Sequence, residues 1–191
     1  MKRSVSTLSG EDQNFLSGAP KFLQSAALYG KNVVMYTIDI PLNEDGILDK
    51  ISKPDLPKYG IYVVRNGREV IRIGESSSGF DRISKGFRQK LRHIRKGRDK
   101  KNYLAYSWRD NYRNTTLNVD YFTLEAEPFS ENHIRRALEA EITFQFRIAM
   151  RSWPRNMSEI HFLERYRENV VLVAKAAEVM KHYGHKYNVA V

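Results

Sequence analysis

The chain has 191 residues, which suits a single domain with a sizeable buried core. It contains no cysteine, which excludes a disulfide scaffold and any thiolate metal site, and we expect a protein of the reducing cytoplasm. Its N-terminal stretch lacks the apolar centre of a secretory signal, and no apolar run approaches the ~20 residues of a membrane span.

The positive charge is concentrated in one part of the chain. Residues 82–113 contain twelve Lys or Arg and two Asp, so this basic segment carries +10, the net charge of the whole chain. Such concentration is typical of a surface that binds a polyanion such as nucleic acid. The alternatives are an ordinary solvated helix and loop, and an anionic membrane surface, which is disfavoured because the apolar residues here are needed for packing. The candidate phosphate contacts are Lys85, Arg88, Arg92, Arg95, Lys96, Arg98, Lys100, Lys101, Arg109 and Arg113.

The first third of the chain contains few regular elements. We expect a frayed polar start over residues 1–18 and a short helix over residues 20–30. The run NVVMYTIDI (32–40) predicts a strand because it is rich in β-branched and aromatic residues. A turn over residues 43–46 and a stiff, proline-containing linker over residues 53–58 follow.

A β-hairpin is predicted next, because GIYVVR (60–65) and EVIRIG (69–74) flank an Asn-Gly pair. Its register decides which side chains share a face. A plain two-residue turn pairs Tyr62 with Ile71 and places Arg72 on the opposite face. An odd-length loop or a bulge instead places Tyr62 directly across from Arg72.

The remaining sequence predicts helices and one more strand. A helix over residues 81–96 follows the serine–glycine corner, with Ile83, Phe87, Leu91 and Ile94 in one apolar stripe. A strand over 118–127 precedes a helix over 131–150 that Ser130 can cap, and Trp153-Pro154 ends it. Ser158 can cap a last helix that ends at Gly184. The predicted fold is α+β, a small antiparallel sheet flanked by helices.

The helix over 131–150 places a carboxylate among apolar residues. Glu141 projects into the middle of the arc formed by Ile134, Leu138, Phe144, Ile148 and Ala149, and Glu139 projects to its edge. A carboxylate that faces a core requires a partner. The partner is either an arginine in a buried ion pair or a hard cation such as Mg²⁺.

Three other polar residues have both a chemical and an ordinary interpretation. Arg82 and His93 lie about three turns apart on one face of the helix over 81–96. Arg82 could grip a phosphate and His93 could carry a proton, although surface decoration also explains such residues. Tyr62 could position a water molecule or could simply belong to the core.

Taken in this order, these residues resemble the GIY-YIG nuclease family, and its type II restriction members in particular. Gly60-Ile61-Tyr62 matches the first element, and Arg72-Ile73-Gly74 the second. The helix arginine, the helix glutamate and an asparagine beyond the proline break match Arg82, Glu141 and Asn156. The resemblance covers residues 58–157, and leaves an N-terminal extension (1–57) and a C-terminal helix (158–191) inside the same single domain.

The resemblance implies a Mg²⁺-dependent endonuclease of double-stranded DNA, with Mn²⁺ able to substitute and a homodimer acting on the DNA. It implies that Glu141 holds the metal, that Asn156 contacts DNA, and that the catalytic residues are Tyr62, Arg72, Arg82, His93 and Glu141. The chain departs from the family at Arg72, where the family has its second tyrosine. Some restriction-type members place a basic residue there.

Two other classes of function remain open. A non-catalytic nucleic-acid-binding protein on a degenerate form of the fold explains the basic segment equally well, and a basic RNA-associated structural protein is a further alternative. Among nucleases, a repair or homing enzyme is the alternative to a restriction enzyme.

Overall fold

The computed structural model describes residues 2–5, 33–45, 48, 52–94, 111–124, 127–166 and 169–187, and for residues 2–5, 88–94, 165 and 184–187 it describes the backbone alone. The helix expected over residues 20–30 and half of the basic segment, residues 95–110, lie outside these ranges.

Within the described part of the chain, the strands form one antiparallel five-stranded sheet in the order β1-β2-β5-β3-β4. The strands are β1 (Lys2–Val5), β2 (Val34–Pro41), β3 (Gly60–Asn66), β4 (Glu69–Ser76) and β5 (Thr116–Thr123). The helices are α2 (Phe80–Ile94), α4 (Asn132–Met150) and α5 (Val170–Tyr187), with a short 3₁₀ turn η2 (Glu164–Tyr166) before α5. These elements confirm the α+β class.

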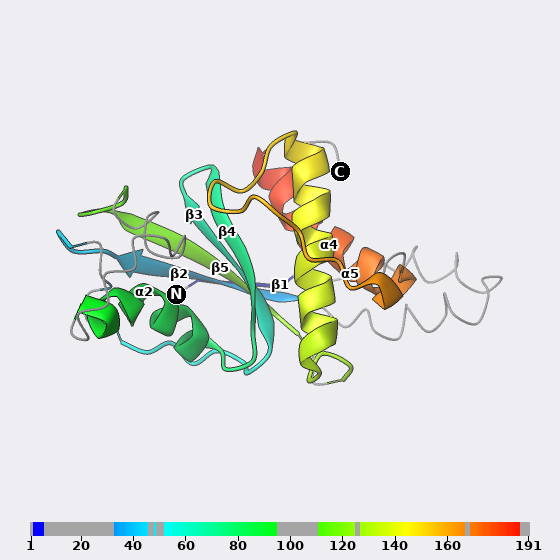
Figure 1. Ribbon diagram of the computed structural model, residues 1–191, viewed down its shortest axis with the longest axis horizontal. Coiled ribbons are helices and arrows are strands. Elements are labelled where there is room, and N and C mark those ends of the chain that lie inside the picture. The colour runs from blue at the N-terminus through cyan, green and yellow to red at the C-terminus, as the bar shows by residue number, and fades with distance from the viewer. Residues whose placement is uncertain are drawn as a thin grey trace.

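Helices cover both faces of the sheet (Figure 1), because alternate residues of the inner strand β3 are apolar on both sides. Ile61 and Val63 belong to a core shared with α4 and α5. Tyr62 and Val64 belong to a second core that includes Phe80, at the start of α2.

In the described residues, no helix is long and apolar enough to cross a membrane.

Several predicted boundaries are wrong, including those of the strand expected over 118–127, which runs from Thr116 to Thr123 as β5. Residues 2–5 form β1 and pair with β2, so the polar start is partly a strand that covers an otherwise open sheet edge. Ser130 does not cap α4, since its hydroxyl group donates to Glu127 Oε1 at 3.1 Å. The last helix starts at Val170 rather than after Ser158, because Asn169 Oδ1 accepts hydrogen bonds from the first free backbone N–H groups, and it continues past Gly184 to Tyr187.

A buried ionic network joins the sheet to α5. Arg65 Nε donates to Asp120 Oδ2 at 2.7 Å, and Arg65 Nη2 donates to Oδ1 at 3.1 Å. The hydroxyl groups of Thr37 and Tyr183 donate to the same carboxylate at 2.8 and 3.0 Å. Each carboxylate oxygen of Asp120 therefore accepts two hydrogen bonds, as a buried charge requires.

Candidate active site

The hairpin between β3 and β4 contains both a two-residue turn and a bulge. Gly67 and Arg68 form the turn, with Gly67 in the left-handed region (φ 56°). Arg65 pairs with Val70, whereas Val64 pairs with Arg72, so Ile71 is the extra residue of the bulge. A bulge was one of the two arrangements expected to bring these residues to one face, and it moves Arg72 to the face of the sheet that carries Tyr62. We expected Arg72 directly across from Tyr62, but it lies two residue pairs further along the hairpin, opposite Val64.

Gly74 is the residue that stands directly opposite Tyr62. A Cβ atom at Gly74 would lie 2.8 Å from Tyr62 Cε1 and nearer still to the hydroxyl group. The phenol ring therefore lies across the backbone of β4, where only glycine leaves room for it. Because β4 is the edge strand, the hydroxyl group of Tyr62 reaches the rim of the sheet.

Charged residues from three further elements act on this hydroxyl group. Arg72 of β4, Arg82 of α2 and Glu139 of α4 all interact with it electrostatically. Burial raises the pKa of Tyr62, and the two guanidinium groups oppose this shift only in part. Tyr62 is therefore a neutral phenol at pH 7.

Glu139 is the carboxylate of this cluster. Its side chain lies where α4 passes the edge of β4, and its Oε2 accepts a hydrogen bond from the backbone N–H of Glu75 at 2.9 Å. Burial raises the pKa of Glu139, while the Glu75 N–H, Arg72 and Arg82 act in the opposite direction. A buried carboxylate with a raised pKa gains from an additional cation.

Glu141, the predicted carboxylate, lies elsewhere on α4. Its Oε1 accepts a hydrogen bond from Gln145 Nε2 at 2.9 Å, and the same nitrogen donates to the backbone of Val173 in α5. The predicted apolar arc was centred on the wrong side of the helix, since Phe144 and Ile148 are 40% and 63% exposed.

The sequence contained a signal for the correct side of α4. Arg135, Glu139 and Thr143 are polar at four-residue spacing and therefore lie on one face of the helix. Arg135 and Thr143 are buried. Arg135 Nε donates to Glu75 Oε2 at 2.9 Å, which binds this face of α4 to β4 beside Glu139.

Asn156 lies beside the bulge. The segment Arg155–Met157, which we call the edge segment, runs along the free edge of β4. Backbone N–H groups of Arg155 and Asn156 donate to the carbonyl groups of Val70 and Ile71 at 3.0 and 2.9 Å. The side-chain Nδ2 of Asn156 is enclosed and has no hydrogen-bond partner among the described residues. An enclosed donor of this kind is available to a ligand or a water molecule.

The other predicted site residues are only partly described. His93 belongs to α2, but its side chain lies outside the described residues, and the helix rise separates its backbone from that of Arg82 by about 16 Å. Lys85 and Arg113 are exposed. The side chains of the other basic candidates lie outside the description: Arg88, Arg92, Arg95, Lys96, Arg98, Lys100, Lys101 and Arg109.

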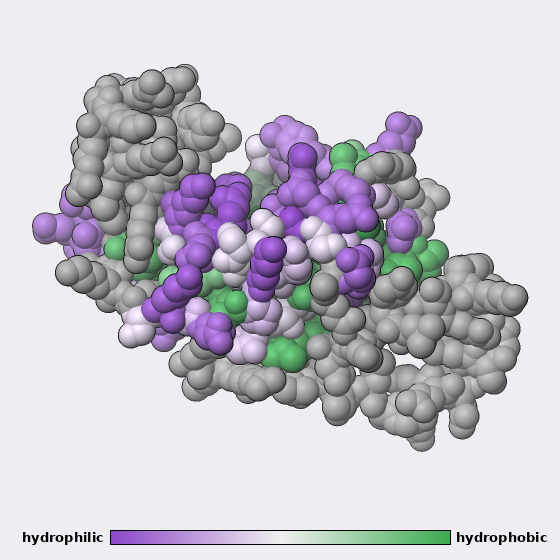
Figure 2. Space-filling model, turned by 90° about the horizontal axis from the view of Figure 1, so that it is seen from below, coloured by the Kyte–Doolittle hydropathy of each residue, from purple (hydrophilic) through white to green (hydrophobic). Residues whose placement is uncertain are grey.

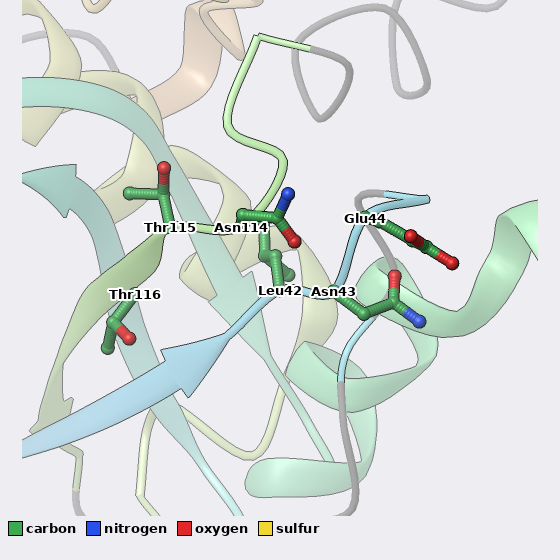
Figure 3. A pocket seen from close by; sticks show the side chains of 6 residues that line it. All are labelled: Leu42, Asn43, Glu44, Asn114, Thr115 and Thr116. Carbon is green, nitrogen blue, oxygen red and sulfur yellow. The ribbon is translucent and has the colours of Figure 1, made fainter.

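Two open hollows have linings that do not include Tyr62, Arg72, Arg82 or Glu139. One, of about 440 Å³, borders the start of α2 and is lined in part by Lys53, Lys58 and Ser78. The other, of about 420 Å³, lies between the end of β2 and the start of β5 and is lined in part by Asn43, Glu44 and Asn114 (Figure 3). The face seen from below in Figure 1 is mostly hydrophilic among the described residues (Figure 2).

Comparisons with models of protein families, with curated proteins and with solved structures gave no significant match.

Proposed function

We propose that the protein is a Mg²⁺-dependent endonuclease of the GIY-YIG type that hydrolyses phosphodiester bonds in double-stranded DNA, with Mn²⁺ able to replace Mg²⁺. The observation that carries this proposal is the convergence of Tyr62, Arg72 and Arg82 with a half-buried carboxylate, Glu139. They come from β3, β4, α2 and α4, and the bulge is needed to bring Arg72 among them. A phenol, two guanidinium groups and a carboxylate suit phosphoryl chemistry better than they suit packing.

Glu139, rather than Glu141, is the metal ligand in this proposal. Its Oε1 makes no hydrogen bond to the described residues, and burial has raised its pKa, so a cation beside it is favoured. Mg²⁺ needs only one or two carboxylates when substrate phosphate and water complete its shell. The described residues contain no group of three or more ligands, which agrees with such a site. When bound, Mg²⁺ would stabilise the negative charge that develops on the phosphate and the leaving oxygen.

The chain's own residues supply the remaining chemistry. Tyr62, on which the Arg72 guanidinium acts electrostatically, orients the attacking water through its hydroxyl group. Tyr62 acts as a neutral phenol, because burial keeps its pKa above the ordinary value. Arg72 and Arg82 neutralise the charge of the transition state, so Arg72 takes over part of the work of the family's second tyrosine.

The basic segment supports DNA as the substrate. If it makes about six phosphate contacts, the log–log slope of affinity against salt should be near −5. We propose that two copies act on one DNA site, as a type II restriction enzyme does, since cutting both strands together needs two active sites.

Two matched variants of α4 test the proposal. Purified protein is incubated with supercoiled plasmid in Mg²⁺ or in EDTA, and nicked and linear products are quantified. We expect Mg²⁺-dependent cleavage that Glu139→Gln lowers by about 10²–10³-fold. Glu141→Gln removes the same charge two residues away and should cleave at close to the wild-type rate.

The rival functions predict different results. Tight DNA binding without cleavage in Mg²⁺ or Mn²⁺ would identify a non-catalytic binding protein. Preference for RNA in competition binding would identify an RNA-associated protein. Loss of cleavage in Glu141→Gln with retention in Glu139→Gln would refute our choice of carboxylate while leaving the nuclease function in place.

A further inference from the structure

Glu69, the first residue of β4, joins three segments of the chain. Its Oε1 accepts a hydrogen bond from Arg155 Nη1 at 2.6 Å, and its Oε2 accepts one from the Tyr112 hydroxyl group at 2.8 Å. Both contacts cross long stretches of sequence. Arg155 belongs to the edge segment, and Tyr112 stands at the end of the basic segment, where that segment leads into β5. We call this arrangement the Glu69 clasp.

The Tyr112 arm of the clasp is firmly placed. The Tyr112 side chain is 4% exposed and packs in the core between α2 and the sheet. Burial and the Glu69 carboxylate raise the pKa of Tyr112 to about 12, so its hydroxyl group remains a donor at physiological pH. The hydrogen bonds from Arg155 and Tyr112 outweigh burial and lower the pKa of Glu69, so the carboxylate is charged.

The Arg155 arm adjoins the phosphate site, by which we mean the residues proposed to bind the scissile phosphate, Arg72 and Arg82. The backbone N–H of Arg155 donates to Val70 O, and that of Asn156 donates to Ile71 O, the extra residue of the bulge. Arg72 is the next residue. The clasp and Arg72 are therefore three residues apart on one strand, about 10 Å.

We propose that Glu69 is a positioning residue that couples the basic segment to the phosphate site. The inference rests on the proposed nuclease function. DNA held by the basic segment is placed relative to Arg72 and Asn156 by Glu69, whose carboxylate binds Tyr112 and Arg155 at the start of β4. Loosening the clasp leaves the charge of the basic segment intact, so it lowers the cleavage rate rather than the affinity. Misplacement by about 1 Å at a phosphoryl-transfer site is enough to lower a rate by up to ~10²-fold.

Steady-state cleavage and DNA binding of the full chain test this coupling. Glu69→Gln should lower kcat about 10-fold or more and leave the Kd for a plasmid-derived duplex within about 3-fold. Tyr112→Phe and Arg155→Gln each remove one arm and should lower kcat less. Because both arms act through one carboxylate, Glu69→Gln/Tyr112→Phe should be no slower than Glu69→Gln alone.

Glu44→Gln is the matched control, because it removes an exposed carboxylate from the turn after β2 that makes no hydrogen bond among the described residues. It should leave kcat unchanged. A second readout does not depend on activity: without DNA, trypsin should cut after Arg113 faster in Glu69→Gln and Tyr112→Phe than in wild type, since the hydrogen bond of Tyr112 to Glu69 holds the chain next to this site.

The outcomes separate the two proposals. Wild-type cleavage with an unchanged kcat in all three clasp variants would overturn the coupling and leave the nuclease function standing. A fall in affinity that equals the fall in kcat would also overturn it, because it would show a binding role. Absence of any cleavage by the wild type would overturn the proposed function and the coupling together.

Discussion

The molecule contains two clusters of charged side chains that differ in how fully they are paired. In the Asp120 network, one carboxylate accepts four hydrogen bonds from Arg65, Thr37 and Tyr183. In the cluster around Tyr62, two guanidinium groups act electrostatically on one carboxylate, Glu139, whose pKa burial has raised. A carboxylate that contributes to stability is fully paired. A carboxylate that is buried with few partners has a raised pKa and can still bind a ligand.

The largest effect is expected where the pairing is complete. Asp120→Asn leaves Arg65 buried without its counter-ion and should lower the free energy of unfolding by about 3–5 kcal/mol. Urea denaturation followed by circular dichroism measures this loss. Asp39→Asn is the control, since Asp39 is exposed and accepts one hydrogen bond, from Asn118 Nδ2 at 2.7 Å. Equal losses in the two variants would show that the network does not hold the sheet to α5.

A smaller effect on stability is expected beside Tyr62. In Gly74→Ala the new methyl group must displace the phenol ring, because the backbone of β4 cannot move away from its pairing with β3. We expect a loss of about 1–3 kcal/mol in unfolding free energy and a loss of plasmid cleavage of about 10-fold or more.

Gly86→Ala in α2 provides the matched comparison. A Cβ atom there meets nothing within 4 Å, so the change should raise the free energy of unfolding by about 0.5–1 kcal/mol through helix propensity. Unimpaired cleavage by Gly74→Ala would show that the place of Tyr62 over β4 is irrelevant to activity.

Removing the charge of Glu139 should stabilise the folded protein, whereas removing the charge of Asp120 should destabilise it. Because the pKa of Glu139 is raised in the folded state, its favourable contribution is present below the ordinary value of 4.5 and is lost as the pH rises through the folded value. Glu139→Gln should therefore raise the Tm at pH 7, by about 2–4 °C for each kcal/mol gained, and raise it less at pH 4. Differential scanning calorimetry measures both. Mg²⁺ should raise the Tm of the wild type alone, and an equal Mg²⁺ effect in the variant would contradict the proposed ligand.

The smallest effect on stability is expected at Glu69. Its contribution to stability changes with pH in the direction opposite to that of Glu139. The lowered pKa of Glu69 means that its contribution to stability is present above 4.5 and is lost as the pH falls through the folded value. The urea midpoint of the wild type should fall between about pH 5 and pH 3, and that of Glu69→Gln should fall less. Parallel curves would show that the clasp does not contribute to stability.

Local sequence signals predicted most of the fold. The Asn-Gly pair between two β-rich runs predicted the hairpin, and the spacing of Ile83 and Phe87 predicted the buried side of α2. The helix caps were predicted less well, because serines near a helix start are common. At the start of α5, the side chain that accepts the hydrogen bonds is Asn169. The pairing of Lys2–Val5 with β2 was not predicted, because a short polar strand has no signal of its own.

The candidate site, like the fold, was predicted from the sequence only in part. The sequence by itself identified Tyr62, Arg72 and Arg82 as candidate site residues, because their spacing along a hairpin and a helix start is a local property. Only the tertiary structure decided which carboxylate joins them, because helical periodicity gives the angle between Glu139 and Glu141 but not the side of α4 that meets β4. That side follows from the packing of Arg135, Leu138 and Ile142 against the sheet, which depends on contacts some sixty residues apart and on the one-residue bulge at Ile71.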